Sequence, residues 1–242
     1  MFGTAWIYRC RYEGKIVRML DVSGSLQSAT YLDNDNWCDL AFPYMRLYDR
    51  VFDTQPCPQE ILMLGGGGFA FPKHVIAHRS PAHIDVVEID PAIVRIAYQH
   101  FFVRRLEQEY PETKSRMRVF QTDALTHLQN CHNAGRRYDA ILNDCYARQQ
   151  LDTSLATPKA LEIVADCLSP EGLYMINVVS ALEGSESEPL MILVNALTTV
   201  FAYVGILPCG RTEPNQIDNV VVIGSQNNPH ISDAITIFEE LG

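Results

Sequence analysis

The residues best suited to chemistry stand where apolar segments of the sequence end. A glycine run, Gly65–Gly68, follows the apolar residues 61–64, and Glu88 ends the next apolar run. Two further apolar runs lead to Asp123 and Asp144. Glycines allow a sharp turn and close approach to a ligand, while a carboxylate at the end of the next strand can accept hydrogen bonds from both ribose hydroxyls. This order predicts a site for a ligand that contains adenosine.

The residues after the glycine run distinguish two kinds of adenosine ligand. A dinucleotide site has the pattern G-x-G-x-x-G, with a helix N-terminus directed at the pyrophosphate. Ala70 takes the place of the third glycine, which that pattern tolerates, but Phe69 and Phe71 crowd the position of a pyrophosphate. A ligand without phosphates, S-adenosylmethionine or its decarboxylated form, fits better. The alternative is a glycine turn that merely packs a helix on a sheet.

Asp123 follows a third apolar run and is expected at the same sheet edge, where ligands of doubly wound sheets bind. Its carboxylate can accept a hydrogen bond from the adenine amino group, and Ala124 can offer its backbone N–H to the ring. The alternative role of Asp123 is to cap a helix over 124–131, a position that favours Asp. The two roles are compatible.

Asp144 follows the buried run 138–143 and is also expected beside the ligand. A carboxylate there can act as a general base toward an amine nucleophile, or hold the charge of the amine. The alternative is a helix cap or a loop anchor. Cys145 is interpreted as a small lining residue, since no base is identifiable for it. Tyr146 is the better candidate for packing against the ligand or the acceptor.

The composition narrows the classes of partner. The 242 residues carry a net charge of −10, which repels nucleic-acid phosphates and favours a cationic small substrate. No run approaches 18 apolar residues and no signal peptide is recognisable, so no membrane partner is expected. The seven cysteines form no C-x-x-C pair, which suits a reducing cytoplasm rather than a disulfide framework. The expected partner is a small-molecule amine or another small acceptor.

The histidines are not expected to bind a metal. His74, His78, His83 and His100 show no ligand spacing with nearby acids. We expect them to be helix-surface or capping residues.

Two predicted units must position these residues. Residues 1–34 hold short alternating runs with turn signals between them, which predicts an N-terminal β-meander. Residues 35–242 form the second unit, which begins with a helix over 35–53. Its strands are expected at 60–64, 83–88, 116–120, 138–143 and 171–179, and its helices at 70–79, 91–109, 123–131, 157–168 and 187–202.

Strands that alternate with helices predict right-handed crossovers and a parallel sheet. Residues 203–207 and 219–223 flank a loop rich in Gly, Pro and Asn, which predicts a terminal antiparallel hairpin. Residues 230–240 are expected to form a closing helix. The predicted architecture is therefore an α/β, Rossmann-like class I methyltransferase fold, with a mostly parallel seven-stranded sheet preceded by the β-meander.

The sequence resembles the spermidine synthases, and more closely the broader spermidine-synthase-like (polyamine aminopropyltransferase-like) group. The resemblance covers roughly residues 18–225 and is carried by five motifs in the order seen in that family. They are Leu20–Ser28, Leu64–Gly67, Val86–Pro91, Thr122–Ala124 and Tyr138–Asp144. The resemblance implies that Gln27 and Glu88 contact the ribose side and that Asp123 and Ala124 hold adenine. It further implies that Asp144 is the catalytic carboxylate and that the protein is a homodimer.

The predicted site has a donor half and an acceptor half. Asp144 is the expected catalytic residue, and Tyr44 and Tyr146 are expected to line the acceptor. The donor half is expected to comprise Gln27, Gly65, Gly66, Gly67, Glu88, Ile89, Asp123 and Ala124.

The sequence departs from the family's motifs at positions that bind the acceptor and at one that binds the amine of the donor's aminopropyl group. The family's glycine motif is GGGDGG, and Gly68 replaces its aspartate, which helps hold the aminopropyl amine. Ala147 replaces the second aspartate of a D-x-x-D motif, and Phe42-Pro43-Tyr44 replaces Tyr-(His/Gln)-Glu. Removing a carboxylate that pairs with an ammonium group costs roughly 2–5 kcal/mol of binding. Efficient use of putrescine is therefore not expected.

Three functions remain open at this point. The first is transfer of an aminopropyl or related alkyl group from decarboxylated S-adenosylmethionine to an altered amine acceptor, which releases methylthioadenosine. The second is methyl transfer from S-adenosylmethionine, which releases S-adenosylhomocysteine; here Gly68 leaves room for the methionine carboxylate. The third is a non-catalytic nucleoside-binding homologue, against which the retained Asp144 speaks. A comparison of binding of the two donors separates the first two.

Overall fold

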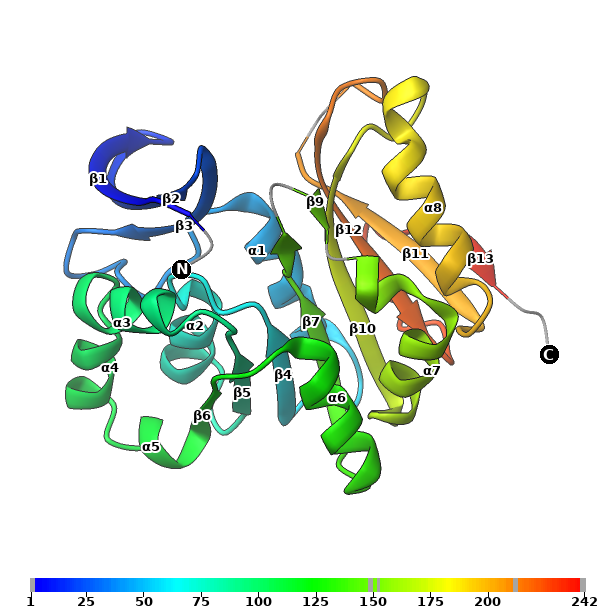
Figure 1. Cartoon of the computed structure of the whole chain (residues 1–242), viewed down its shortest axis with the longest axis horizontal. Coiled ribbons are helices and arrows are strands. Elements are labelled where there is room, and N and C mark those ends of the chain that lie inside the picture. The colour runs from blue at the N-terminus through cyan, green and yellow to red at the C-terminus, as the bar shows by residue number, and fades with distance from the viewer. Residues whose placement is uncertain (1–2, 148–149, 152, 211–212, 240–242) are drawn as a thin grey trace.

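The computed structural model describes residues 3–147, 150–151, 153–210 and 213–239, and is built around an eight-stranded sheet (Figure 1). The strand order is β13-β11-β12-β10-β7-β4-β5-β6. The five strands from β10 to β6 run parallel, and β11, β12 and β13 pair antiparallel. The bounds are β4 Glu60–Leu64, β5 His83–Val87, β6 Met117–Phe120, β7 Tyr138–Asn143, β10 Leu168–Ser180, β11 Tyr203–Pro208, β12 Asp218–Ser225 and β13 Ile235–Glu239. This topology confirms the predicted α/β class and the terminal antiparallel hairpin.

The last strand corrects two details of the prediction. Residues 230–240 were expected to form a helix, but Ile235–Glu239 is strand β13, which pairs antiparallel with β11. The sheet therefore has eight strands instead of seven. The physical reason is the run Ile235-Thr236-Ile237, because β-branched side chains favour a strand over a helix.

Helices cover both faces of this sheet, so its strands are buried on both sides. In β4, Ile61 and Met63 belong to one hydrophobic cluster, while Leu62 and Leu64 belong to the cluster on the opposite face. The first cluster lies under α1 (Pro43–Tyr48), α2 (Ala70–His78) and α4 (Val103–Glu109), and the second under α6 (Ala124–Asn133), α7 (Pro158–Asp166) and α8 (Glu188–Leu197). Within the described residues, no helix is both long and apolar enough to cross a membrane.

Three predicted helices are shorter or interrupted in the structure. One of them, expected over 187–202, ends as α8 at Leu197. The helix expected over 35–53 begins only at Pro43, which takes an N-terminal helical position, and continues after α1 as the 3-10 helix η1 (Asp49–Asp53). The helix expected over 91–109 is divided into α3 (Pro91–His100) and α4 by Phe102, whose φ of 67° is left-handed. The remaining short elements are α5 (Thr113–Arg116), β8 (Tyr146–Ala147), β9 (Gln150–Leu151), η2 (Thr153–Ala156) and η3 (Ser185–Ser187).

The predicted β-meander is present as a separate three-stranded antiparallel sheet. It comprises β1 (Ala5–Tyr12), β2 (Lys15–Val22) and β3 (Ser25–Tyr31). Its buried side chains Val17 and Met19 belong to the same hydrophobic cluster as the core of the main sheet. The small sheet is therefore packed onto the larger one at the end where β3 approaches the glycine loop.

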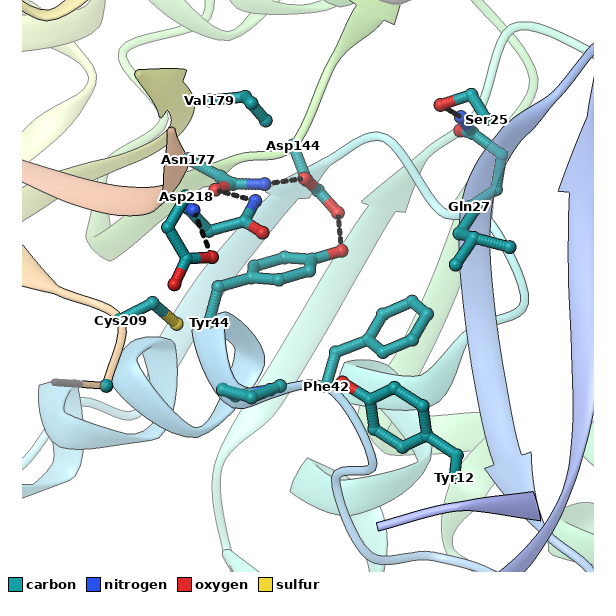
Figure 2. Close-up of a pocket in the computed structure, with 14 residues that line it drawn as sticks. Tyr12, Ser25, Gln27, Phe42, Tyr44, Asp144, Asn177, Val179, Cys209 and Asp218 are labelled. Carbon is teal, nitrogen blue, oxygen red and sulfur yellow. Dashed lines mark hydrogen bonds between the residues drawn. The ribbon is translucent and has the colours of Figure 1, made fainter. Parts of the chain in front are cut away.

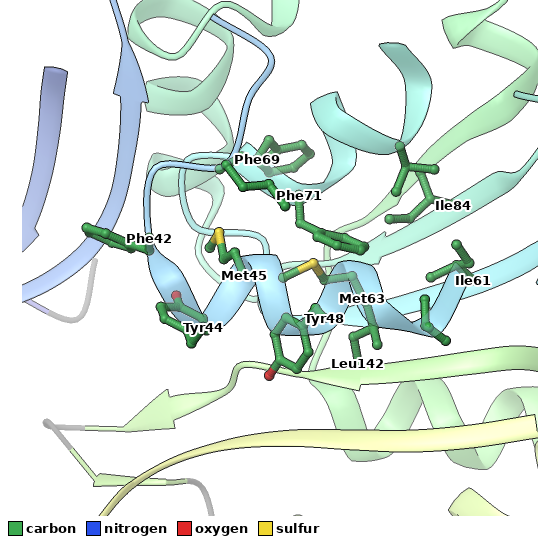
Figure 3. Packing of buried hydrophobic residues seen from close by; sticks show 14 of the residues in the cluster. Phe42, Tyr44, Met45, Tyr48, Ile61, Met63, Phe69, Phe71, Ile84 and Leu142 are labelled. Carbon is green, nitrogen blue, oxygen red and sulfur yellow. The ribbon is translucent and has the colours of Figure 1, made fainter. Parts of the chain in front are cut away.

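Tyr48 fastens α1 to the carboxyl ends of two central strands (Figure 3). Its side chain is fully buried, and its hydroxyl donates to the Asn143 carbonyl oxygen at 2.6 Å. The same hydroxyl accepts the backbone N–H of Asn177 at 2.8 Å. Tyr44 lies four residues earlier and so occupies the same face of the helix. The anchoring of Tyr48 thereby places Tyr44 over the end of β7.

Candidate active site

Asp144 directly follows β7 and has both carboxylate oxygens hydrogen-bonded. Its Oδ2 accepts from the Tyr44 hydroxyl at 2.9 Å, and its Oδ1 accepts from Asn177 Nδ2 at 3.0 Å. Burial raises the pKa of Asp144 to about 6, although the two hydrogen bonds act in the opposite direction. The carboxylate can therefore gain or lose a proton close to neutral pH, which is what a general base requires.

Asp144 faces a cavity of about 310 Å³ between the main sheet, α1 and the N-terminal sheet (Figure 2). Acidic and amide side chains supply its polar wall, and aromatic rings supply its apolar wall. The polar wall includes Asp144, Asp218, Asn177 and Asn219, and the aromatic wall includes Tyr12, Phe42 and Tyr44. Gln27 and Ser25 on β3 also line it, so the N-terminal sheet forms part of the wall. Such a cavity suits a small molecule with a cationic group and an apolar part.

Three polar residues of this cavity were missed by the sequence analysis. Asn177 Nδ2 holds Asp144, and Asn177 Oδ1 accepts from Asn219 Nδ2 at 2.8 Å. Asp218 Oδ1 in turn accepts the backbone N–H of Asn219 at 2.7 Å. One signal was available: Asn177 interrupts the apolar strand β10 and is buried, and a buried amide needs partners. Nothing local in the sequence connects Asp218 or Asn219 with Asp144.

The Glu88 carboxylate binds the backbone of the glycine loop. The side chain is buried, and its Oε2 accepts the backbone N–H groups of Gly66 at 3.0 Å and Gly67 at 3.2 Å. Its Oε1 accepts the N–H of Asp90 at 2.9 Å. Burial raises the pKa of Glu88, and these backbone hydrogen bonds oppose that rise. The carboxylate thus stabilises the conformation of the glycine loop.

The glycine loop joins the two halves of the predicted site. Gly65 has a φ of 89°, and a Cβ there would lie 2.6 Å from the Asp144 carbonyl oxygen. Gly67 has a φ of 49°, and a Cβ there would lie 3.2 Å from the Gln27 carbonyl oxygen. Only glycine adopts such positive φ values without strain and also allows this close backbone approach. The loop therefore runs between the catalytic candidate and the N-terminal sheet.

The residues predicted for adenine lie near the ends of the next strands. Asp123 caps α6, because its Oδ1 accepts the N–H of Thr126 at 2.9 Å. The capping role considered as an alternative is therefore present. Ala124 begins α6 and is buried, whereas Ile89 is half exposed between Glu88 and Asp90. The lining of the cavity that contains Asp144 includes none of Asp123, Ala124 and Ile89.

Gly68, which stands at the family's aspartate position, has no room for a side chain. A Cβ there would lie 2.5 Å from Ser28 Oγ, 2.8 Å from Ser28 Cβ and 2.9 Å from Phe101 Cδ1. Ser28 and Phe101 are both fully buried. Ser28 and Phe101 thus fill the space that a side chain at position 68 would need.

The remaining acceptor-side predictions differ in how far they can be placed. Tyr44 and Phe42 both contribute to the cavity wall, and their rings stack with centroids 5.9 Å apart. Tyr146 and Ala147 form strand β8, but their side chains lie outside the described part of the structure.

Comparisons with known proteins identify the family of this chain. Residues 47–204 match the family described as "Spermine/spermidine synthase domain". The polyamine aminopropyltransferase of Vibrio vulnificus (strain CMCP6) is 30% identical over 139 residues, which cover 57% of this chain and 44% of that protein. The eEF1A lysine and N-terminal methyltransferase homolog of Drosophila melanogaster is 28% identical over 152 residues, 60% of this chain and 21% of that protein. The chain thus matches less than half the length of either relative.

Solved structures support the fold. A probable spermidine synthase from Corynebacterium glutamicum ATCC 13032 has a TM-score of 0.71 at 19% identity and covers 93% of this chain and 81% of its own. Human methyltransferase-like protein 13, solved in complex with SAH, has a TM-score of 0.59 at 22% identity and covers 78% and 81%. Because the matched domain, residues 47–204, is more than half of the chain, this chain belongs to the spermine/spermidine synthase domain family.

Proposed function

We propose that this protein transfers an alkyl group, in the first instance aminopropyl, from an adenosyl sulfonium donor to an amine acceptor. The observation that carries this proposal is Asp144, a carboxylate of raised pKa that faces a cavity and is held by Tyr44 and Asn177. An amine attacks only after losing a proton, and Asp144 accepts that proton. The new carbon–nitrogen bond forms as the carbon–sulfur bond breaks, which leaves a neutral thioether. The name of the V. vulnificus relative supports the aminopropyl group.

The donor's ribose is proposed to lie at Glu88. A carboxylate has about four acceptor positions, and three backbone N–H groups use three of them. One position on Oε1 therefore remains for a ribose hydroxyl without any change in the glycine loop. The donor set thus fits a nucleoside. Gly65, Gly66 and Gly67 would supply the close backbone approach, and Gln27 would close the site from the N-terminal sheet.

The adenine ring is proposed to lie between Ile89 and the start of α6. Ile89 offers an apolar surface that is 48% exposed. Asp123 has one carboxylate oxygen engaged in capping, which leaves the other for the adenine amino group. Ala124 would offer its backbone N–H to the ring, as the resemblance to the family implies.

The acceptor is proposed to be a small amine bound in the cavity of about 310 Å³. Its reacting nitrogen would lie at Asp144, against the ring of Tyr44. Asp218 supplies a second carboxylate to the same cavity, from β12. A second cationic group of the acceptor would be neutralised there, in place of the family's aspartate at position 147. Tyr146 remains a proposed lining residue.

The first experiment is calorimetric titration with S-adenosylmethionine, decarboxylated S-adenosylmethionine and methylthioadenosine. The proposal expects tighter binding of the decarboxylated donor and turnover with an amine from a screened set. Binding of none of the three would overturn the assignment of the donor site.

The second experiment tests Asp144 by its substitution with asparagine. Asp144→Asn keeps a similar shape, so donor affinity is expected to persist while turnover falls roughly 10²–10⁴-fold, the usual contribution of a positioned base. The matched control is Asp166→Asn, because that carboxylate is 60% exposed and lies outside the cavity. Parallel loss of donor binding and turnover in Asp144→Asn would contradict the assigned role.

Methyl transfer from S-adenosylmethionine is a second candidate, and a specific observation favours it. Residue 68 is glycine, so no carboxylate stands there to hold an aminopropyl ammonium or to repel a methionine carboxylate. The expected room for that carboxylate at Gly68 is absent, however, because Ser28 and Phe101 fill the space. The Drosophila relative is named a methyltransferase homolog, which supports this option. Tighter binding of S-adenosylmethionine than of its decarboxylated form would select this function.

The setting of the activity is also part of the proposal. We infer a cytoplasmic protein of polyamine or related amine metabolism that assembles as a homodimer. The seven free cysteines support a reducing compartment. Support for a dimer comes from the N-terminal sheet, which exposes the large apolar side chains Trp6, Tyr8, Ile16 and Leu26.

A further inference from the structure

A cluster of metal-ligand side chains lies on α2, apart from the cavity described above. His74 and His78 are four residues apart and therefore share one face of the helix. Asp39, from the segment that precedes α1, joins them. Ligand atoms of the three residues all lie within 4.8 Å of one another, and His78 Nε2 is 3.3 Å from Asp39 Oδ1. Among the described residues, this is the group of His, Cys, Asp and Glu side chains whose ligand atoms lie close enough together to bind one metal ion.

We propose that Asp39, His74 and His78 bind a divalent transition-metal ion of the zinc class. Tetrahedral bonds of 2.0–2.1 Å place neighbouring ligand atoms about 3.3 Å apart, which matches the separation between His78 and Asp39. Two imidazoles and one carboxylate leave a fourth position for water. This ligand set suits zinc or cobalt better than magnesium or calcium, which prefer oxygen ligands alone.

The surroundings of His74 supply the outer contacts that metal-binding histidines usually have. Nδ1 lies 3.3 Å from the Cys38 carbonyl oxygen, and Nε2 lies 3.2 Å from Asp49 Oδ1. Nε2 is buried, and its contact with Asp49 lacks the geometry of a hydrogen bond. If Nε2 binds the metal, Nδ1 has the Cys38 carbonyl oxygen as the acceptor that orients the ring.

Asp39 is oriented in a similar way. Its Oδ2 accepts a hydrogen bond from Asn36 Nδ2 at 3.0 Å, which leaves Oδ1 directed at His78. The side chains of Asp39 and His78 are each 41% exposed, so an ion can reach them from solvent.

The local charges are compatible with a cation. Arg79 binds Asp49 through two hydrogen bonds and so neutralises that carboxylate. Asp39 has no arginine or lysine among its partners in the described part of the chain, which are His78 and Asn36.

The test is titration of the full chain with Co²⁺ and with Zn²⁺, followed by absorption and calorimetry. We expect one ion per chain, with a cobalt spectrum that lacks the intense thiolate charge-transfer band. His78→Ala and Asp39→Asn should weaken binding by more than the roughly 10–100-fold that loss of an outer-shell partner costs, and Asn36→Ala should fall within that range. Each change is at a partly exposed or exposed side chain, so folding is expected to persist.

The matched control is His132→Ala, which removes a histidine paired with one carboxylate, Asp166, at 3.4 Å. It should bind the ion as the unaltered chain does. Three results would overturn the proposal: no binding, equal binding by His78→Ala and the control, or a thiolate band that disappears in Cys57→Ser. The last would assign the metal to the exposed cysteine.

Discussion

Asp144 owes its raised pKa to a balance between burial and two hydrogen bonds. Since the pKa in the folded state exceeds the ordinary value of 3.8, ionisation of this carboxylate opposes folding. Its contribution to the free energy of unfolding is therefore most favourable below the ordinary value, and declines as pH rises toward about 6. The group is kept at some cost in stability, which is typical of a residue selected for reaction with a proton.

The pKa of Asp144 can be shifted by removal of one of the two side chains that donate hydrogen bonds to it. Tyr44→Phe deletes a hydrogen bond that stabilises the ionised form of Asp144, so the pKa of Asp144 should rise further above about 6. The pH profile of turnover, which should rise with pH through this pKa, is expected to move to higher pH. The control is Tyr12→Phe, a change of the same kind in the same cavity. An unmoved profile in Tyr44→Phe would show that another group controls it.

At the scale of elements, the loop between β4 and α2 depends on Glu88. Three backbone N–H groups, those of Gly66, Gly67 and Asp90, donate to this carboxylate. Glu88 therefore holds the loop in its conformation even without a ligand, in addition to its proposed contact with the donor's ribose. Loss of binding after its removal would then combine two effects that must be measured separately.

Glu88→Ala is expected to lower the free energy of unfolding of the ligand-free protein by about 1–3 kcal/mol, since buried donors lose their acceptor. It should also weaken donor binding. Urea denaturation measures the first effect, and calorimetry measures the second. Glu162→Ala, an exposed carboxylate on α7, is the control and should change neither. Full stability of Glu88→Ala would mean that water replaces the carboxylate under the loop.

Residue 68 precedes α2 and is enclosed by β3 and the end of α3. This packing limits the size of the side chain that can stand at position 68. Gly68→Ala already places a Cβ in contact with Ser28 and Phe101. Overpacking of this kind costs about 1–3 kcal/mol, and Gly68→Asp should cost at least as much because it adds a carboxylate. Thermal denaturation of both variants measures this. If Gly68→Asp melts like the unaltered chain and gains affinity for the decarboxylated donor, then the site is readily restored and the packing argument fails.

At the scale of the whole molecule, one part of the small N-terminal sheet lines the cavity and another part is exposed. Gln27 and Ser25 line the cavity, while Trp6 is 64% exposed on β1. The sheet shares its buried side chains with the main core, as Val17 and Met19 show. The predicted division of the chain into two units, residues 1–34 and 35–242, therefore remains a prediction. A second copy of the chain is the proposed cover for the exposed apolar residues.

Trp6→Ser should weaken the proposed homodimer by roughly 2 kcal/mol or more, if Trp6 is one of the aromatic anchors that dominate interfaces. Sedimentation velocity over a range of concentrations measures the association. Ile192→Ser is the control, because Ile192 is 59% exposed on α8, far from the N-terminal sheet in Figure 1. A monomer at all concentrations before substitution would contradict the dimer proposal.

The sequence by itself determined the parts that depend on local pattern. Continuous apolar runs such as residues 61–64 and 138–143 predict buried parallel strands, and polar residues after such runs must meet at one sheet edge. The places of Glu88, Asp123 and Asp144 at the ends of these runs were therefore predicted without any structure, and their roles remain predictions. The helix expected over 230–240 was wrong, because the β-branched residues at 235–237 favour a strand, which pairing with β11 stabilises.

Only the tertiary structure decided what depends on contacts between distant segments. Tyr44 and Asp144 are separated by 100 residues, and Asp39 reaches His78 from the segment before α1. The packing that fills the space at Gly68 also comes from distant elements, β3 and the end of α3. Side-chain packing and buried hydrogen bonds act over distances of a few ångströms in space, and separation along the chain does not report them. The acceptor cavity is therefore a property of the fold, whereas the donor motifs are visible in the sequence.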